Sequence, residues 1–284
     1  MTSLAAIIGD PVSQSLSPAI HNAAFRSMRV DWLYLPFLVQ SGRLRETFAI
    51  LPRFDVVGLS VTMPHKAEVA RIVGEIGDVD ETVAIIGAAN TVHFRPDGSI
   101  HATNTDGQGC CAAIVEATGA DLARCRVVVV GAGSTAAAVA HALVLNNAKD
   151  VAVVNRTAAR ANELAKKLNG RCRVVEPSDV ESAVKQAQII VNTTPVGFNP
   201  SNLQGAATES PIDTKFLHAE HVVVDAVYRP LMTPLLTAAE NVGAKVVDGL
   251  AMLVHQAALQ QKVWLGVAGD VDLMRQTALS AMQR

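Results

Sequence analysis

Apolar and polar positions alternate along the chain in a rhythm that is typical of α/β proteins. Between residues 127 and 249, short apolar runs are separated mostly by stretches with the 3.6-residue period of amphipathic helices. The apolar runs predict six strands, at 127–130, 151–155, 172–176, 189–194, 222–228 and 245–248. The periodic stretches predict helices at 135–147, 158–169, 179–187 and 233–243. This alternation predicts a doubly wound parallel sheet, the Rossmann architecture.

The residues that precede this region have an α/β rhythm of their own. The pattern predicts strands at 4–9, 33–39 and 56–62, helices at 18–28, 41–51 and 65–74, and a hairpin of 90–94 with 100–104. Two further helices, at 250–264 and 270–283, exceed the Rossmann complement, and we expect them to return to the first domain. The sequence therefore predicts a two-domain α/β protein. One domain comprises residues 1–106 plus 249–284, and a dinucleotide-binding Rossmann domain comprises residues 107–248, with a polar surface loop at 195–212.

A glycine-rich turn follows the first predicted Rossmann strand, Val127–Val130. Gly131 allows a tight turn, Gly133 lets backbone N–H groups approach a pyrophosphate, and the small Ala136 lets the next helix pack closely on the strand. The pyrophosphate would lie at the positive N-terminus of that helix. We therefore expect a dinucleotide to contact the turn residues Gly131, Ala132, Gly133, Ser134 and Thr135.

The end of the second Rossmann strand indicates which dinucleotide is bound. NAD sites usually place an acidic residue there to accept the ribose hydroxyls, whereas this chain has Asn155, Arg156 and Thr157, with Arg160 one turn further on. Asp150 lies at the opposite end of the strand. Arginine binds phosphate through a planar, bidentate fork, and Thr157 is placed to cap the following helix. These residues predict NADP(H) as the cofactor, through its 2′-phosphate.

Composition excludes several other classes of function. With 284 residues, half of them apolar, and a net charge of −2, the chain has no basic surplus for binding nucleic acid. It has no uninterrupted apolar stretch long enough to span a membrane and no secretory signal in residues 1–9, so we expect a cytoplasmic protein. The cysteines lack CxxC spacing and the histidines lack an HExxH motif, so we expect reduced core thiols and no metal site.

Three polar clusters in the first domain are candidates for chemistry. They are Ser13–Pro18, Ser60–Lys66, and the pair of segments 87–91 and 104–107. Ordinary structural interpretations exist for each cluster: Ser17 as a helix N-cap before proline, Lys66 as a solvated lysine, and Asp106 as an N-cap. If the fold brings Lys66 and Asp106 together, the carboxylate would orient the ammonium, and the two would form a proton-transfer pair.

The motifs resemble those of the shikimate dehydrogenase family, in family order and over nearly the whole chain. The matching segments are Gly9-Asp-Pro11, Ser15-Leu-Ser17-Pro18, His21-Asn22, Val61-Thr62-x-Pro64-x-Lys66, Gly87-Ala-Ala-Asn90-Thr91, Asn104-Thr105-Asp106, Gly131-x-Gly133, Asn155-Arg156-Thr157, Asn192-Thr-Thr-Pro195-Val-Gly197, Asp225-x-x-Tyr228, Thr233-Pro234-Leu235-Leu236 and Gly249-Leu-x-Met252-Leu-x-x-Gln256. Two positions depart from the family pattern: Ser60 stands where many members carry Asn, and Gln261 stands where an aromatic residue is common. The first could alter contacts with ring hydroxyls, and the second is interpreted as repacking.

The resemblance implies a role for each matching residue. Lys66 and Asp106 would be catalytic, and Ser15 and Ser17 would hold the substrate carboxylate. The carboxylate and ring hydroxyls would also contact Thr62, Asn90, Tyr228 and Gln256, and the nicotinamide would lie near Ala226, Gly249 and Met252.

The implied reaction is the NADP-dependent, reversible reduction of 3-dehydroshikimate to shikimate, without a metal, by a monomer or homodimer. One alternative is a quinate/shikimate dehydrogenase or a related paralogue. An alternative of another class is a non-catalytic, NADPH-responsive binding protein. The intact Lys66 and Asp106 argue against a protein that only binds, since binding requires neither residue.

Overall fold

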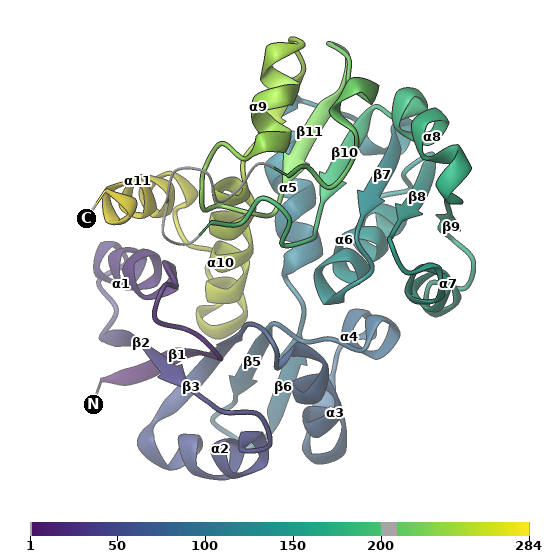
Figure 1. Cartoon of the computed structure of the whole chain (residues 1–284). Helices are drawn as coiled ribbons and strands as arrows, with labels where there is room; N and C mark the ends of the chain where they lie inside the picture. The colour runs from purple at the N-terminus through teal and green to yellow at the C-terminus, as the bar shows by residue number, and fades with distance from the viewer. Residues whose placement is uncertain (1, 200–208, 284) are drawn as a thin grey trace. The chain divides into compact units, whose positions relative to one another are not determined.

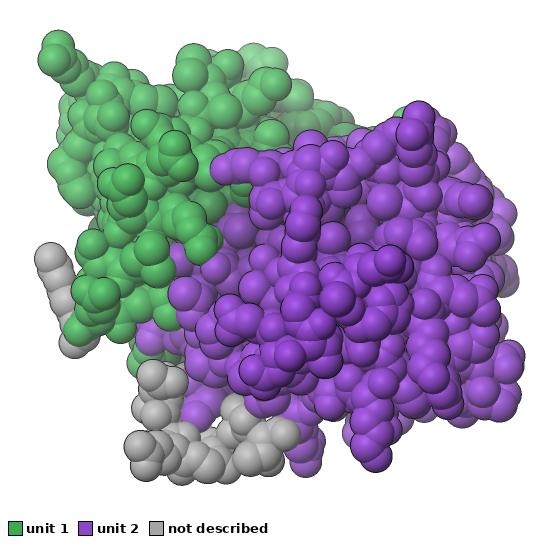
Figure 2. Space-filling model, turned by 90° about the horizontal axis from the view of Figure 1, so that it is seen from above, with its two compact units in different colours: residues 1–105, 254–284 green, residues 106–253 purple. Residues whose placement is uncertain are grey.

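The computed structural model describes residues 2–199 and 209–283, which form two compact units (Figures 1 and 2). One unit contains residues 1–105 and 254–284, and the other contains residues 106–253. The long helix α10, Gly249–Leu265, therefore begins in the second unit and ends in the first. Each unit is built around its own six-stranded sheet, as expected for an α/β protein.

The first unit has a mixed sheet with strand order β2-β1-β3-β5-β6-β4. Its strands are β1 (Ser3–Gly9), β2 (Trp32–Leu38), β3 (Val56–Val61), β4 (Asp78–Val79), β5 (Thr91–Phe94) and β6 (Ile100–Thr103). The strands β1, β2 and β3 are parallel, whereas β5 is antiparallel to both β3 and β6. The predicted hairpin is therefore confirmed, and the short strand β4 was not predicted.

The helices of the first unit pack against this sheet or, in the case of the last helix, against the first helix. They are α1 (Ser17–Ser27), α2 (Leu44–Ile50), α3 (Lys66–Ile76), α4 (Glu81–Ile86), the end of α10 and α11 (Val271–Met282), with a 3₁₀ helix at Leu51–Phe54. Val69, Ile72 and Val73 of α3 pack in one core cluster with Leu59 and Val61 of β3. The helix α11 contacts α1, and the C-terminal segment belongs to the first unit.

The second unit has an all-parallel sheet with strand order β12-β11-β10-β7-β8-β9. Its strands are β7 (Arg126–Val130), β8 (Asp150–Val154), β9 (Arg173–Val174), β10 (Ile189–Asn192), β11 (Val222–Asp225) and β12 (Lys245–Val247). Chain order reverses between β10 and β8 around the central β7, which is the arrangement of a doubly wound Rossmann sheet. Ligands of such sheets bind beyond the carboxyl ends of the strands at this reversal.

Helices cover both faces of the second sheet. They are α5 (Asp106–Thr118), α6 (Ser134–Leu145), α7 (Ala158–Lys167), α8 (Val180–Gln186) and α9 (Pro234–Asn241), with 3₁₀ helices at Leu122–Arg124, Pro177–Asp179 and Thr214–Phe216. Residues of α8 and α9 share a core cluster with alternate residues of β7, including Val128 and Val130. The loop prediction at 195–212 falls partly on residues 200–208, which lie outside the described residues.

Candidate active site

The two candidate carboxylate-binding serines lie at the start of α1. The backbone N–H of Ser17 donates to Ser15 Oγ at 3.2 Å, so the two residues form one compact turn. Ser17 is the first residue of α1, and Leu16 occupies the N-cap position without a side-chain hydrogen bond. The interpretation of Ser17 as an ordinary N-cap is therefore wrong, because its hydroxyl caps nothing. The Ser17 hydroxyl instead lies beside that of Tyr34, where it opposes the rise that burial causes in the pKa of Tyr34.

The second polar cluster follows β3 and leads into α3. Thr62 comes directly after the strand, and its N–H donates to the Ile8 carbonyl at 2.9 Å, which fixes its position beside β1. The helix begins at Lys66, one residue later than predicted, because His65 is the N-cap residue. Lys66 is half-buried and lies in the first helical turn, where the helix dipole disfavours a cation.

Asn90 is the centre of the third cluster. Its side-chain oxygen accepts from the Thr105 N–H at 2.8 Å and from the Thr91 hydroxyl at 2.7 Å. Its amide nitrogen donates to Thr105 Oγ1 at 3.0 Å and to Gln256 Oε1 at 3.2 Å. The structure thus brings together Asn90 and Gln256, two residues expected to bind substrate hydroxyls, although 166 positions separate them in the sequence.

Backbone contacts link this cluster to the candidate catalytic residues. The Ala89 N–H donates to the Lys66 carbonyl at 2.9 Å, so the first turn of α3 is tied to the residue before Asn90. Asp106 follows Thr105, the partner of Asn90, and is the first residue of α5. Asp106 is also buried. The side-chain pairing of Lys66 with Asp106 remains a proposal.

The glycine turn after β7 has the geometry that the motif predicts. Gly131 has φ +117°, and a Cβ at this position would lie 2.5 Å from Thr193 Oγ1, so only glycine is accommodated. Gly133 is the N-cap residue of α6, and a Cβ there would meet no protein atom within 4 Å. The N-terminus of α6 is therefore unobstructed by protein at Gly133. An open helix N-terminus of this kind fits a pyrophosphate.

Two arginines follow β8 without partners in the described part of the protein. The side chains of Arg156 and Arg160 are exposed, and neither forms an ion pair or a hydrogen bond with another described residue. Thr157 is the N-cap residue of α7 as expected, but its side chain makes no capping bond. Asn155 Nδ2 instead donates to the Thr157 carbonyl at 2.9 Å. Two uncommitted guanidinium groups beside a helix N-terminus are suited to a phosphate monoester.

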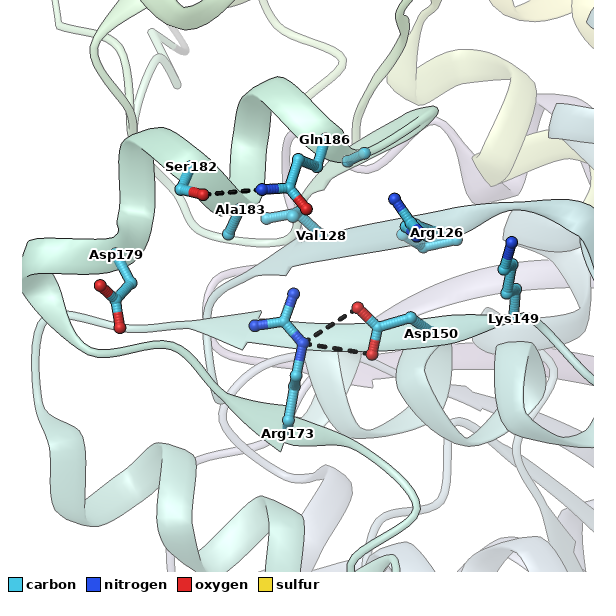
Figure 3. Close-up of a pocket in the computed structure, with 11 residues that line it drawn as sticks. Arg126, Val128, Lys149, Asp150, Arg173, Asp179, Ser182, Ala183 and Gln186 are labelled. Carbon is cyan, nitrogen blue, oxygen red and sulfur yellow. Dashed lines mark hydrogen bonds and ion pairs between the residues drawn. The ribbon is translucent and has the colours of Figure 1, made fainter.

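The only acidic residue of β8 lies at the amino end of the strand and forms an ion pair there. Asp150 pairs with Arg173, whose Nε lies 2.9 Å from Asp150 Oδ2, beside Arg126 and Lys149 (Figure 3). These residues line a hollow of about 570 Å³ at the amino ends of β7, β8 and β9. Because that edge is opposite to the carboxyl ends of the strands, the hollow is not part of the candidate cofactor site.

A buried carboxylate at the end of β11 was assigned no role from the sequence. Asp225 accepts from Asn192 Nδ2 at 2.9 Å, from the Val227 N–H at 2.9 Å and from the Thr233 hydroxyl at 2.8 Å. Burial raises the pKa of this carboxyl to about 6, although the three donors oppose the shift. The signal available in the sequence was a polar residue closing an otherwise all-valine strand.

The hydrogen bonds of Asp225 hold the segment that contains Ala226, a residue expected to lie near the nicotinamide. Ala226 and Val227 follow the carboxylate directly, and a Cβ at Gly249 would lie 2.4 Å from the Val227 carbonyl oxygen. Glycine at 249 is therefore required for α10 to begin against this segment. Met252 is buried in the next turn, and Tyr228 is half-buried, with its pKa raised mainly by burial.

The structure adds three findings on the remaining expectations. All four cysteines are buried and free. Among residues 2–199 and 209–283, no group of three or more metal-ligating side chains comes together. Within the same residues, no helix is both long enough and apolar enough to cross a membrane.

Three family models match the chain in the same order as its motifs. The family model described as the shikimate dehydrogenase substrate binding domain matches residues 7–92. The model described as shikimate / quinate 5-dehydrogenase matches residues 113–205, and that of the shikimate 5'-dehydrogenase C-terminal domain matches residues 249–279. The chain belongs to the shikimate dehydrogenase family. The expected family and the mixed α/β, Rossmann-type fold are thereby confirmed.

Two relatives with the same name match this chain over almost its whole length. The protein named shikimate dehydrogenase (NADP(+)) from Methanosarcina acetivorans is 39% identical, over 98% of this chain and 98% of its own length. The protein of the same name from Methanopyrus kandleri is 37% identical, over 99% of this chain and 97% of its own length.

Two solved structures resemble the chain equally well but differ in name. One is shikimate 5-dehydrogenase from Thermus thermophilus in complex with NADP(H) and shikimate, with a TM-score of 0.87 and 32% identity over 99% of this chain and 100% of that one. The other is quinate dehydrogenase from Corynebacterium glutamicum in complex with NAD, with a TM-score of 0.88 and 30% identity over 98% and 99%. Fold similarity alone therefore does not select the substrate, and the choice must rest on residues of the site.

Proposed function

We propose that this protein is an NADP-dependent shikimate dehydrogenase. It reversibly reduces 3-dehydroshikimate to shikimate, a step of the shikimate pathway to chorismate and the aromatic amino acids. Family membership over the whole chain supports the reaction class. The observation that carries the cofactor preference is the pair of guanidinium groups of Arg156 and Arg160. They have no partner among the described residues and lie at the position where NAD-binding relatives of the fold place an acid.

Lys66 and Asp106 are proposed to handle the proton. In the reductive direction the substrate carbonyl gains a hydride at carbon and a proton at oxygen, and Lys66 gives the proton to the forming alkoxide. In the oxidative direction the Lys66 amine removes it. Asp106 holds the Lys66 ammonium in place and accepts a hydrogen bond from a substrate hydroxyl. A positioned acid–base group of this kind contributes roughly 10²–10⁴-fold to the rate.

The remaining site residues are proposed to bind and orient the substrate. Ser15 and Ser17 form one turn at the start of α1, and their hydroxyls suit the substrate carboxylate. Asn90 and Gln256 already share a hydrogen bond at 3.2 Å, so their amides can hold adjacent hydroxyls with little reorganisation. Thr62 and Tyr228 complete the set of polar side chains.

The residues of the second unit fit NADP(H), which supplies or accepts the hydride when it is bound. The turn residues 131–135 would hold the pyrophosphate, because Gly131 makes the tight turn and the position of a Gly133 Cβ is open. Residues 155–160 would hold the adenosine 2′-phosphate. Ala226, Gly249 and Met252 would lie near the nicotinamide. In this assignment the second unit binds the cofactor, and the first unit supplies most of the substrate-binding residues, with Asp106 and Tyr228 coming from the second.

We infer a preference for shikimate over quinate from the polar groups around Ser15 and Ser17. Quinate carries an extra hydroxyl on the carbon that bears its carboxylate, so this hydroxyl must find a partner beside the serine turn. Tyr34, the buried polar side chain that contacts Ser17, already donates its proton to Ser60. A buried hydroxyl without a partner costs about 1–3 kcal/mol, which corresponds to roughly ten- to a hundredfold in kcat/KM.

We also propose a cytoplasmic location and a monomeric or homodimeric state. Four free, buried cysteines suit a reducing compartment, since nothing in the fold depends on their oxidation. The proposed ligands are small molecules, and neither nucleic acid nor a membrane has a role in the reaction.

A coupled steady-state comparison tests the proposal. Purified protein is assayed with shikimate and with quinate, each with NADP and with NAD, by following nicotinamide absorbance. We expect the highest kcat/KM for shikimate with NADP. Equal efficiency with quinate would favour the quinate/shikimate dehydrogenase alternative, and binding of NADPH without turnover of any substrate would favour the binding protein.

A further inference from the structure

A chain of buried polar side chains runs through the first unit, from β2 across β3 to α10. The Tyr34 hydroxyl donates to Ser60 Oγ at 2.6 Å, and the Ser60 hydroxyl donates to Gln260 Oε1 at 2.7 Å. All three side chains are buried, with at most 5% of any residue exposed. Buried polar groups are retained only when they are hydrogen-bonded, so these three residues depend on one another.

The other end of the Gln260 amide contacts β5 and the residue before it. Gln260 Nε2 donates to the Asn90 carbonyl oxygen at 3.1 Å and to Thr91 Oγ1 at 3.1 Å. A backbone carbonyl can only accept, so the amide nitrogen must face Asn90 and the amide oxygen must face Ser60. This orientation fixes the direction of the whole chain: Tyr34 donates to Ser60, and Ser60 donates to Gln260.

The network continues from Gln260 to the candidate substrate groups at both ends. Because Thr91 Oγ1 accepts from Gln260, its own proton is directed to Asn90 Oδ1, at 2.7 Å. Gln260 therefore holds Asn90 twice, through its carbonyl and through Thr91. At the other end, the Tyr34 hydroxyl lies beside that of Ser17, the candidate carboxylate ligand, which opposes the rise that burial causes in the pKa of Tyr34.

We propose that Gln260 is a positioning residue for substrate binding. This inference rests on the proposed function, and no role for Gln260 follows from the family motifs. Its amide fixes Asn90, which orients a ring hydroxyl, and through Ser60 it also fixes Tyr34, which lies beside Ser17, the residue that holds the carboxylate. One buried amide on α10 thereby sets the relation between the two ends of the substrate site.

A second buried hydrogen-bond donor on the same helix provides a comparison for Gln260. Trp264 lies one turn later on α10, and its Nε1 donates to the Val92 carbonyl of β5 at 2.9 Å. Trp264 thus also joins α10 to β5 through a buried hydrogen bond, but Val92 is not a candidate substrate ligand. The two residues form a comparison pair: Gln260 hydrogen-bonds to the network, whereas Trp264 only packs near the ring of Tyr34, with 6.3 Å between the ring centroids.

The test compares Gln260→Met with Trp264→Phe in the full-length protein. Methionine keeps the length of glutamine but neither donates to Asn90 and Thr91 nor replaces its amide oxygen, and phenylalanine removes only the indole donor. We expect Gln260→Met to raise KM for shikimate and to lower kcat/KM for shikimate by about ten- to a hundredfold, the effect of misplaced substrate groups. The KM for NADP should change by less than about twofold, because the proposed NADP residues lie in the other unit.

Trp264→Phe should lower Tm at least as much as Gln260→Met, yet leave both KM values within about twofold of the wild type. A second variant separates positioning from stability. Replacing Tyr34, Ser60 and Gln260 together by Phe, Ala and Met removes the polar groups as a set, which costs less stability than leaving one partner buried alone. This triple variant should keep a Tm near that of the wild type and show the same kinetic loss.

The role of Gln260 is contradicted if Gln260→Met changes KM for shikimate no more than Trp264→Phe does. It is also contradicted if the triple variant has wild-type kinetics, and that measurement decides the matter if Gln260→Met does not fold. The wild-type assay distinguishes the two claims. Lack of shikimate oxidation by the wild type contradicts the proposed function, whereas normal turnover by the variants contradicts only the positioning role.

Discussion

The buried carboxyl of Asp225 provides a test of the electrostatics at the end of β11. Its pKa is raised from 3.8 to about 6, mainly by burial, so the native state binds a proton more tightly than the unfolded chain does. The contribution of Asp225 to the free energy of unfolding therefore falls as pH rises from about 4 to about 6 and changes little with pH above that range. The difference between these two pKa values corresponds to about 2–3 kcal/mol in the free energy of unfolding.

Asp225→Asn removes this titration while keeping the size of the side chain. Urea unfolding of both proteins between pH 4 and pH 8 gives the difference in free energy of unfolding, wild type minus variant. We expect that difference to decrease by about 2–3 kcal/mol between pH 4 and pH 7, because only the wild type loses a proton from this position. The subtraction removes the contributions of all other titrating groups, provided that the m-values of the two proteins agree.

A difference that stays constant with pH would refute the reasoning for Asp225. A difference that increases with pH would also refute it, since it would mean that the three hydrogen-bond donors outweigh burial and hold the pKa of Asp225 below its ordinary value. Carbon-13 NMR of the Asp225 carboxyl gives the same answer directly, with a titration midpoint near 6 expected.

Three further predictions concern the proposed roles. Arg156→Ala should raise KM for NADP far more than KM for NAD, with about 1.5–3 kcal/mol lost from a charge-assisted contact; equal changes would contradict the 2′-phosphate assignment. Lys66→Ala and Asp106→Ala should each lower kcat by roughly 10²–10⁴, with a double variant little worse than the poorer single one and NADP binding retained by titration; additive losses would contradict a cooperating pair. Gly133→Ala should weaken NADP binding without lowering Tm, because its Cβ meets no protein atom, whereas Gly131→Ala should lower both; a lower Tm for Gly133→Ala would show that its role is structural.

Much of the fold could be predicted because the sequence pattern is local. The valines of β7 alternate between two buried faces, and Gly131 supplies the turn that only a residue with positive φ can make. The short elements β4 and α4 were not predicted, because the segment from Asp78 to Ile86 is too short to establish a hydrophobic period. The pattern Ser17-Pro18 is common at helix N-caps, but α1 begins one residue earlier than this pattern indicates, with Leu16 as the N-cap residue.

The candidate site was only partly predictable, because the sequence shows local motifs but not contacts between distant residues. Motif residues such as Lys66 and Asn90 are recognisable from their immediate neighbours in the chain. Ser60 and Gln260 are 200 positions apart, so the hydrogen bond between them is a product of tertiary structure. The departure at Gln261 is a buried amide whose nitrogen lies 3.1 Å from His21 Nδ1, which is a polar contact rather than simple apolar repacking.

The most direct test of the proposed function is the ratio of kcat/KM for shikimate to that for quinate, measured with saturating NADP on the purified protein. We predict a ratio of roughly 10–100, because Tyr34, the buried polar side chain beside Ser17, already donates its proton to Ser60 and has none for the added hydroxyl of quinate. A ratio near one would contradict the assignment of shikimate as the preferred substrate.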